Sequence, residues 1–352
     1  MKIIFVVPEI SKTGGMRVIF EYANRLTNEG HDVTVVSPIV PFNAFMGERS
    51  SYYFKYRIKY AARFLTGKIK RPETFFKINF KIKYIPYPSK VFVSKADVYV
   101  ATSWTSAYLV NDIRSDKKIY FVQDYETWTG NKKAVDRSYK LDLQKIVVST
   151  YLKNLLKDKF NEDSEIVLNG IDFNKFDNKE KKDFNVRTIL FMDHSLKNKN
   201  TADAVMAVEN IHTKYPDIKF ICFGRDRYTK MPDYIEFHKD PDDSEIITLY
   251  RKADVFLFTS LYEGFALPPA EAMACKCAVA GYNTAALPDY TINNETALLC
   301  EAGKVDELCL NVEKLINDSK LLEKISLSGY EYVRQKLNWE TAFRRFKKII
   351  FS

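Results

Sequence analysis

The sequence predicts an α/β protein built from two Rossmann-like domains, and three observations lead to this fold class. Short apolar runs without alternation, typical of buried parallel strands, recur between helical patterns, for example at residues 3–7, 98–101 and 255–259. A length of 352 residues is too large for one domain of ordinary size and fits two. The charged run at 178–183 is typical of a solvated linker between them.

The chain opens with a strand, a glycine-containing loop and a helix. Residues 3–7 are the strand, 11–15 the loop, and apolar positions from 18 to 26 recur at helical spacing; a second strand follows at 31–36. This order is typical of a Rossmann-like unit. The loop holds only Gly14-Gly15 and not G-x-G-x-x-G, so a nicotinamide cofactor has little support. A plain tight turn is the alternative explanation of this loop.

A basic and aromatic segment follows at residues 49–71. It has eight Lys or Arg side chains and no acidic one, and Tyr53, Tyr56, Tyr60 and Phe64 recur at helical spacing. A basic amphipathic helix of this kind can lie on an anionic membrane surface, where each Lys or Arg contributes on the order of 1 kcal/mol. The alternative is a helix that packs its tyrosines on the domain and leaves its basic side in water. No nucleic-acid-binding motif accompanies the segment, so we expect no nucleic-acid partner.

Two further strands of the first domain end in polar loops. Residues 98–101 lead to Trp104, and 119–122 lead to Gln123, Asp124 and Tyr125. Ligands of α/β sheets collect beyond the carboxyl ends of the strands, so both loops are candidates for the binding site. Asp124 is the candidate catalytic side chain, with a strand-end cap as an equally weighted alternative. We expect Trp104, Gln123 and Tyr125 to form a wall of this binding site.

The second domain begins with a strand at 188–192, followed by the run DHSLKNK at 193–199. Strands at 220–224 and 234–237 come next, and His238 begins the loop after them. Asp240 and Asp242 superficially match an Asp-x-Asp metal motif. They precede a helix that begins near Ser244, so helix N-capping explains them better than a metal.

The most informative stretch is 255–279, VFLFTSLYEGFALPPAEAMACKCAV. An apolar strand leads into a loop, and Pro268-Pro269 suit the first turn of a helix because proline lacks the N–H that is unpaired there. The loop and helix start present free backbone N–H groups and a partial positive charge, which together favour a phosphate. Gly264 allows close approach to the backbone, and Glu271 can accept hydrogen bonds from ribose hydroxyls. Glu263 would lie near the group that the phosphate carries. An ordinary acidic helix start is the alternative.

This stretch resembles the retaining glycosyltransferases of the GT-B group known as family 4, whose signature is E-x7-E. Glu263 and Glu271 match the spacing, and EAMACKCAVA is similar to the EAMAxGxPVV that follows it in the family, with Lys276 where glycine is usual. The resemblance implies that Glu271 holds the donor ribose, that Glu263 holds the donor sugar, and that the N–H groups around Phe265, Ala266 and Leu267 face the donor phosphates.

Other positions of the family pattern are matched in part. Gly15 lies in the loop that faces the donor phosphates in the family, Lys199 falls at the lysine that clamps the pyrophosphate, and His194 stands where the family has arginine. A neutral histidine supplies less charge, so we expect Lys197 or Arg225 to compensate. The loop of His238 meets the nucleotide base in the family. The Gln123-Asp124-Tyr125-Glu126 form is similar to a subset of members, some of which transfer rhamnose.

The resemblance also implies the domain organisation. Asn169-Gly170-Ile171-Asp172 is similar to the motif that closes the first domain, and 339–346 resembles the last helix, which crosses back onto it. We therefore expect a GT-B fold with an acceptor-side domain at 1–170, a nucleotide-sugar-binding domain at 184–334 and a crossover helix at 335–352, the two domains facing each other across a cleft.

Composition limits the class of protein and its partners. The net charge of +9 suits an acidic partner such as a nucleotide sugar or an anionic lipid surface. Five cysteines without a C-x-x-C pair are typical of reduced core residues in a cytosolic protein. The apolar run at the N-terminus is too short for a signal peptide, and no run is long enough to cross a bilayer. We expect a cytoplasmic protein, with peripheral membrane contact through 49–71 as a candidate.

The sequence thus predicts a retaining transferase that moves a sugar from a nucleoside-diphosphate donor to a glycan or lipid-linked hydroxyl in polysaccharide synthesis. Lys199, Glu263 and Asp124 are the predicted catalytic residues, and we expect neither a cofactor nor a metal. Two alternatives stay open. One is a catalytically idle GT-B module that binds a glycan or nucleotide sugar, motivated by Gln123 and His194. The other is a nucleotide-sugar 2-epimerase on the same fold.

Overall fold

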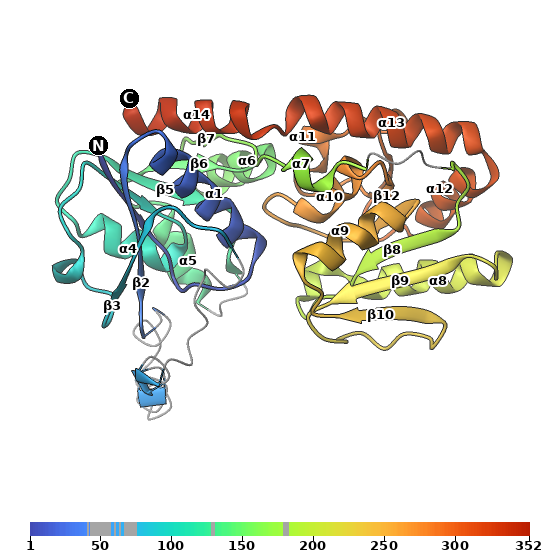
Figure 1. Ribbon diagram of the computed structural model, residues 1–352, viewed down its shortest axis with the longest axis horizontal. Helices are drawn as coiled ribbons and strands as arrows, with labels where there is room; N and C mark the ends of the chain where they lie inside the picture. The colour runs from blue at the N-terminus through green and yellow to red at the C-terminus, as the bar shows by residue number, and fades with distance from the viewer. Residues whose placement is uncertain are drawn as a thin grey trace. The chain divides into compact units, whose positions relative to one another are not determined.

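The computed structural model describes residues 1–40, 42, 58–59, 61–62, 65–66, 76–127, 131–178 and 183–352 (Figure 1). Most of the basic segment 49–71 lies outside these residues. The prediction that this segment contacts a membrane therefore concerns a part of the chain that is mostly not described. The chain divides into two compact units. Unit 1 comprises 1–167 and 343–352, and unit 2 comprises 168–342. Within the described part, no helix combines the length and the apolar character that crossing a bilayer requires.

Unit 1 is built on a seven-stranded sheet in which every pairing is parallel. The strand order is β3-β2-β1-β4-β5-β6-β7, so the order reverses between β1 and β4. The strands are β1 (Lys2–Val6), β2 (Asp32–Pro38), β3 (Lys81–Ile85), β4 (Val98–Ala101), β5 (Lys118–Val122), β6 (Gln144–Val147) and β7 (Glu165–Ile166). The buried apolar runs predicted for this half are therefore confirmed, while β3 is an addition.

The helices of unit 1 begin where a side chain caps them. Thr13, Ser103 and Ser149 accept a hydrogen bond from a backbone N–H of the first turn of α1, α4 and α6, respectively. The helices are α1 (Gly14–Asn28), α4 (Trp104–Asn111), α5 (Lys132–Ser138) and α6 (Thr150–Phe160), with a short 3-10 helix η2 at Lys90–Phe92.

The C-terminal helix α14 (Trp339–Phe351) ends in unit 1. Phe346 is fully buried there, and its ring lies 4.2 Å from that of Tyr22 and 5.7 Å from that of Phe121, measured between centroids. The end of the last helix is therefore fixed in unit 1 by burial of a large aromatic side chain, while the predicted domain bounds of 1–170, 184–334 and 335–352 stay a prediction.

Unit 2 has a six-stranded sheet of the same kind, again with parallel pairings only. Its order is β10-β9-β8-β11-β12-β13, which reverses between β8 and β11. The strands are β8 (Thr188–Met192), β9 (Lys219–Gly224), β10 (Ile235–Lys239), β11 (Val255–Phe258), β12 (Ala278–Tyr282) and β13 (Leu298–Cys300). Because ligands of such sheets bind beyond the carboxyl ends at the reversal, the loops after β8 and β11 are the first place to look for a site.

The helices of unit 2 cover both faces of this sheet (Figure 1). They are α7 (Phe173–Phe176), the 3-10 helix η4 (Lys197–Lys199), α8 (Thr201–Lys214), α9 (Asp243–Lys252), α10 (Leu267–Ala274), α11 (Leu287–Tyr290), α12 (Val305–Asn317) and α13 (Ser319–Lys336). Asp242 accepts a hydrogen bond of 2.9 Å from Glu245 N at the start of α9, which confirms N-capping as the role of this aspartate.

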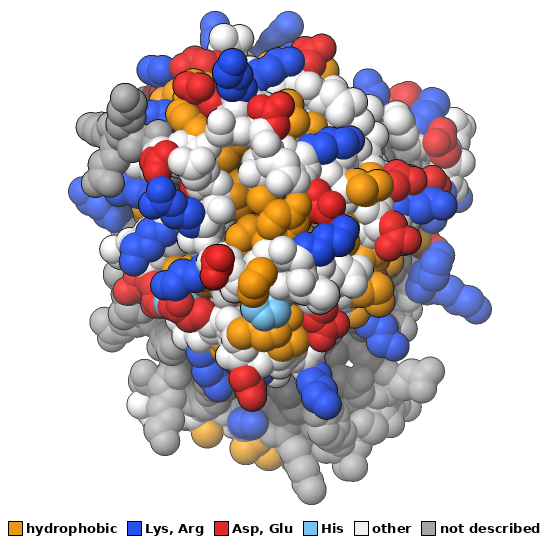
Figure 2. Space-filling view, turned by 90° about the vertical axis from the view of Figure 1, so that its right-hand side faces the viewer, with side chains coloured by type: hydrophobic (Ala, Val, Ile, Leu, Met, Phe, Trp, Pro, Cys, Tyr) orange, Lys and Arg blue, Asp and Glu red, His pale blue; other side chains and the backbone are white. Residues whose placement is uncertain are grey.

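One face of the described chain is mixed in charge. Figure 2 shows basic and acidic side chains interspersed with small apolar patches over the face that it draws. The net charge of +9 is thus not gathered as one basic surface on this side of the described chain.

Candidate active site

The loop after β8 is held in shape by a buried carboxylate. Asp193, 1% exposed, accepts hydrogen bonds from Tyr228 N at 2.7 Å, Thr229 N at 3.0 Å and Thr229 Oγ1 at 2.8 Å. These bonds tie the loop after β9 to the end of β8. The aspartate that precedes His194 therefore has a structural role, and the side chain that follows it is presented at the edge of the sheet.

His194 is neutral and has a defined tautomer. Its Nδ1 lies 3.0 Å from Leu196 N and accepts that hydrogen bond, so the ring proton is on Nε2. Burial, with the nearby Lys199 charge second and Arg225 a smaller contributor, lowers the pKa of His194 below its usual value. The histidine therefore offers a single N–H donor at neutral pH.

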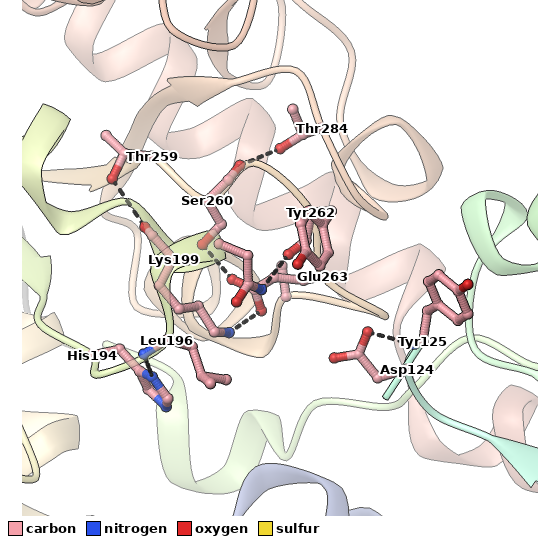
Figure 3. A network of polar contacts seen from close by, with 12 residues as sticks. Asp124, Tyr125, His194, Leu196, Lys199, Thr259, Ser260, Tyr262, Glu263 and Thr284 are labelled. Atoms are coloured by element: carbon pink, nitrogen blue, oxygen red, sulfur yellow. Dashed lines mark hydrogen bonds and ion pairs between the residues drawn. The ribbon is translucent and has the colours of Figure 1, made fainter. Parts of the chain in front are cut away.

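Lys199, Glu263 and Ser260 form a compact polar cluster (Figure 3). Lys199 Nζ lies 2.7 Å from Glu263 Oε2, with side-chain exposures of 16% and 7%, and Ser260 Oγ donates to Glu263 Oε1 at 2.6 Å. Sequence reasoning gave Lys199 to the pyrophosphate and Glu263 to the sugar, but did not foresee that they pair with each other or that Ser260 takes part. An ammonium group has three N–H donors, so Lys199 can keep this bond and still contact a ligand.

The cluster is rigid because its two loops are joined by backbone hydrogen bonds. Leu261 N donates to Asn198 O at 2.7 Å, and Asn198 Nδ2 donates to Tyr262 O at 2.9 Å. Thr284 Oγ1 donates to Ser260 O at 2.6 Å, which fixes the loop from the side of β12. Since β8 and β11 are neighbours in the sheet, their carboxyl ends bring Lys199 and Glu263 together.

The start of α10, predicted to be an anion site, has an unusual backbone conformation. Ala266 is the N-cap residue and adopts the left-handed conformation with φ +66°, without a side-chain hydrogen bond to cap the helix. Its carbonyl oxygen accepts a hydrogen bond of 2.7 Å from Tyr290 Oη. A non-glycine residue in this conformation is strained by about 1 kcal/mol, and strain of this kind is concentrated at functional sites. Pro268 and Pro269 have no backbone N–H, so the N–H groups at this helix start are those of Gly264, Phe265 and Ala266, which are buried, and of Leu267, which is half-buried.

Glu271 lies on the first turns of the same helix and is 8% exposed. Its Oε2 accepts a hydrogen bond of 3.2 Å from Tyr250 Oη. A buried carboxylate beside a helix start can accept hydrogen bonds from ligand hydroxyls, which agrees with the predicted ribose role without testing it.

Three predicted donor-site residues do not join the cluster. Lys197 and Arg225 are exposed, and Arg225 contributes only through its charge on His194. His238 is held between two carboxylates, with Nδ1 2.6 Å from Glu245 Oε1 and Nε2 2.8 Å from Glu236 Oε1. Burial disfavours its charged form, but these hydrogen bonds outweigh burial and raise the pKa of His238. Both ring nitrogens are thus already engaged within unit 2.

In unit 1 the structure brings Gly15 and Gln123 together. A Cβ atom on Gly15 would lie 3.4 Å from the Gln123 carboxamide, and Gln123 Oε1 is buried without a hydrogen-bond partner among the residues that the structure describes. This distance is an ordinary van der Waals contact, so Gly15 lies directly beside the amide. Gly15 belongs to the first turn of α1, so the tight turn weighed as its alternative is not present.

The remaining residues of the predicted wall are largely structural. Trp104 is 3% exposed, and Tyr125 is 7% exposed with its hydroxyl 2.7 Å from Asp136 Oδ1. Asp124 Oδ1 accepts a hydrogen bond of 2.7 Å from Tyr125 N. This is a contact at the end of a strand, the alternative to the predicted catalytic role of Asp124. These side chains support the loop after β5 more than they line a surface.

Glu126 is a residue that sequence reasoning did not single out. Its Oε1 accepts a hydrogen bond of 3.2 Å from Trp104 N at the start of α4. Burial, with the Asp124 charge as a smaller cause, raises the pKa of Glu126 to about 8, although the bond from Trp104 N opposes the shift. The carboxyl is therefore protonated at neutral pH. Its position one residue after Tyr125 in a strand-end loop was the available signal.

Comparison with known proteins supports the fold and the enzyme class. Residues 172–332 match the family model described as "Glycosyl transferases group 1", which covers most of unit 2. The capsular polysaccharide biosynthesis glycosyltransferase CapM of Staphylococcus aureus is 27% identical over 184 residues, covering 48% of each chain. The serotype-specific mannosyltransferase WbdA of Escherichia coli is 36% identical over 83 residues, 24% of this chain and 10% of that protein. This chain thus spans about half the length of CapM.

Solved structures match over the whole chain. The Anabaena protein HepE in complex with UDP-glucose has a TM-score of 0.77 at 14% identity, covering 100% of this chain and 99% of that one. Identity at this level speaks for the fold alone. The predicted GT-B fold, with two parallel sheets flanked by helices, is therefore confirmed.

Proposed function

We propose that this protein is a retaining glycosyltransferase that moves a sugar from a nucleoside-diphosphate donor to a hydroxyl of a glycan or lipid-linked acceptor. The match of 172–332 to a glycosyltransferase family model supports the reaction class. The UDP-glucose bound to HepE supports the donor class, and the name of CapM supports a role in polysaccharide synthesis.

One observation carries the proposal: the Lys199–Glu263–Ser260 cluster lies in the loops after β8 and β11, where the strand order of unit 2 reverses. One of these loops continues into the N-terminus of α10. Such a place combines a fixed cation, free backbone N–H groups and a carboxylate for hydroxyls. These are the groups that a sugar diphosphate needs for recognition.

The reaction breaks the bond between the anomeric carbon and the phosphate oxygen, and the electron pair leaves with the nucleoside diphosphate. The acceptor oxygen bonds to the anomeric carbon on the same face, and its proton passes to the departing phosphate. Negative charge grows on that phosphate as the bond breaks. Lys199, His194 Nε2–H and the N–H groups at the start of α10 stabilise this charge, while Glu263 orients the sugar and Glu271 the ribose.

The acceptor side belongs to unit 1. Gln123 contributes its amide, which lies beside Gly15 at the start of α1 and whose oxygen has no hydrogen-bond partner among the described residues. Asp124 orients the acceptor through the loop after β5. Whether residues 49–71 hold a lipid-linked acceptor at a membrane is a separate part of the proposal, motivated by their charge.

The test is a panel of nucleoside-diphosphate sugars incubated with the protein and with candidate glycan acceptors, followed by measurement of nucleotide and product. We expect acceptor-dependent release of the nucleoside diphosphate and an α or β linkage that matches the donor's. An epimerised nucleotide sugar formed without acceptor would favour a 2-epimerase instead. Binding of a nucleotide sugar without any turnover would favour an idle module.

A further inference from the structure

Tyr250 is a buried side chain that connects Glu271 to the segment with which unit 2 begins. It lies on α9, is 1% exposed, and its ring packs on Phe223 and Phe256, with centroids 5.9 Å and 5.8 Å away. Its hydroxyl donates to Glu271 Oε2 at 3.2 Å. Phenylalanine could fill the same space, so packing explains the ring but not the hydroxyl.

The other neighbour of the ring belongs to residues 173–178, which we call the entry segment. It comprises α7 (Phe173–Phe176) and the two residues after it. The ring of Phe176 lies 6.2 Å from that of Tyr250. The side chain that holds Glu271 is therefore itself packed against the entry segment.

The entry segment is fixed to α9 and α10 by hydrogen bonds to its backbone carbonyls. Arg251 Nη2 donates to Lys175 O at 2.8 Å and to Asp177 O at 3.0 Å. Cys275 Sγ donates to Phe176 O at 2.8 Å, and Lys276 Nζ donates to Asn178 O at 2.6 Å. Because these donors come from α9 or from the end of α10, Tyr250 sits in a rigid frame that includes the helix of Glu271.

A hydroxyl in a rigid frame fixes the rotamer of the carboxylate that it contacts. Glu271 is 8% exposed, so a wrong orientation would leave it facing buried apolar groups instead of a ligand. We propose that Tyr250 is a positioning residue for Glu271, which orients this carboxylate toward the ribose hydroxyls of the nucleotide. The inference rests on the proposed function, because it assumes a nucleotide donor.

The test is Tyr250→Phe, which keeps the ring and removes the hydroxyl. Loss of one hydrogen bond that holds a binding group predicts a rise of about three- to tenfold in the donor KM, with kcat changed by less than about twofold. Because Glu271 acts on ribose, the variant should also lose part of the preference for the ribonucleotide donor over its 2′-deoxy and 3′-deoxy analogues. A role in folding alone would leave that preference unchanged.

A double-mutant cycle with Glu271→Gln shows whether Tyr250 affects donor binding through Glu271. If Tyr250 acts through Glu271, adding Tyr250→Phe to Glu271→Gln raises the donor KM no further. Tyr215→Phe is the matched control, since the Tyr215 hydroxyl accepts a 2.7 Å bond from Asn317 Nδ2 elsewhere in unit 2 and should leave donor KM unchanged.

The outcomes separate this inference from the proposed function. A wild-type protein that neither binds nor turns over any nucleotide sugar overturns both. A wild type that does so, with an unchanged donor KM and ribose preference in Tyr250→Phe, overturns the positioning role alone. Additive effects in the double mutant overturn it as well, because they mean that Tyr250 does not act through Glu271.

Discussion

At the scale of single residues, the pairing of Lys199 with Glu263 is the central feature of the site. A distance of 2.7 Å between the half-buried Lys199 and the buried Glu263 holds the ammonium group in place before any ligand arrives. Preorganised charge is effective because it need not reorient as the leaving group forms. The pair also means that removing either partner leaves an uncompensated charge, so activity and stability must be measured together.

Lys199→Ala should lower kcat by about 100-fold, the usual cost of removing one donor from a preorganised charge-stabilising site. It should also destabilise unit 2 by roughly 3 kcal/mol, because Glu263 loses its counterion. Steady-state kinetics and urea unfolding measure the two effects. The double variant Lys199→Ala/Glu263→Gln should recover stability but not kcat.

Lys214→Ala is the matched control for this variant. Lys214 Nζ lies 2.6 Å from Glu313 Oε1 in the same unit, but the lysine side chain is 58% exposed. An exposed ion pair contributes only about 0–1 kcal/mol, so this variant should keep its activity and most of its stability. Equal, small effects of the two substitutions on kcat would contradict the role of Lys199.

Glu126 predicts a pH dependence of stability with a definite sign. Its pKa is raised to about 8 in the folded protein from a usual value of 4.5, so the folded state keeps a proton that the unfolded state releases between these values. The stabilising contribution is complete below about pH 4.5 and is lost as the pH rises through about 8. Glu126→Gln should therefore gain stability relative to the wild type between pH 5 and pH 9.

Denaturant unfolding of both proteins at pH 5, 7 and 9 measures this difference. Glu323→Gln, which changes an exposed glutamate, serves as the control and should show no such trend. A difference between Glu126→Gln and wild type that is the same at all three pH values would contradict a protonated Glu126.

The sequence allowed several residues of the site to be named, but it did not reveal which side chains contact one another. The sequence places Lys199 after one strand and Glu263 after another, and the sheet order then brings them together. No periodicity marks Ser260, Tyr250 or Glu126, because each acts through contacts that only the folded chain creates. Gly15 was predicted to lie in a loop, but Thr13 caps α1 so that the helix already includes Gly14 and Gly15, and its packing against Gln123 was not predictable.

At the scale of elements, α10 shows why a departure from the family pattern is tolerated. The helix ends with Cys277 N donating to Ala272 O at 3.0 Å and Lys276 N donating to Met273 O at 2.9 Å, the pattern that places a left-handed residue after a helix. Lys276 holds that position with φ +58°. Glycine is usual there because it adopts such a φ without strain.

Lys276 compensates for this strain through its side chain. Its Nζ donates to Asn178 O at 2.6 Å and lies 5.0 Å from the centre of the Tyr330 ring. Lys276→Ala removes these contacts and keeps the strain, whereas Lys276→Gly removes both. We therefore expect the Ala variant to be less stable than the Gly variant by about 1 kcal/mol.

Thermal and urea unfolding measure this order. A Gly variant that is less stable than the Ala variant would contradict the strain at this position.

The strands differ in how far local sequence patterns predict them. Most were predictable from apolar runs, while β3, with alternating lysines, and β13, with three residues, carry too weak a local pattern and depend on their neighbours in the sheet.

At the scale of the whole molecule, the two units differ in how far their roles are supported. The family model covers 172–332, so the donor side has support from both comparison and geometry. Unit 1 has Gly15, Gln123 and Glu126, but the sequence features that would identify an acceptor lie in 49–71 and outside the described residues. The GT-B fold was predictable because strand runs and the E-x7-E stretch are local signals. The acceptor was not.

Metal dependence is a property of the complete site. Lys199, the His194 N–H donor and the start of α10 together supply the positive charge that a departing diphosphate requires. We therefore expect transfer to persist at an unchanged rate in excess EDTA. Loss of turnover on chelation, restored by a divalent cation, would contradict a leaving-group site made of protein groups alone.

The most direct test of the account is an isothermal titration of the wild type and of Glu271→Ala with nucleoside diphosphates. The account predicts that at least one of them binds the wild type at a single site and binds the variant about tenfold more weakly, the effect of losing roughly 1.4 kcal/mol of hydrogen bonding to ribose. Equal affinity for both proteins, or no binding to the wild type by any nucleoside diphosphate, would contradict it.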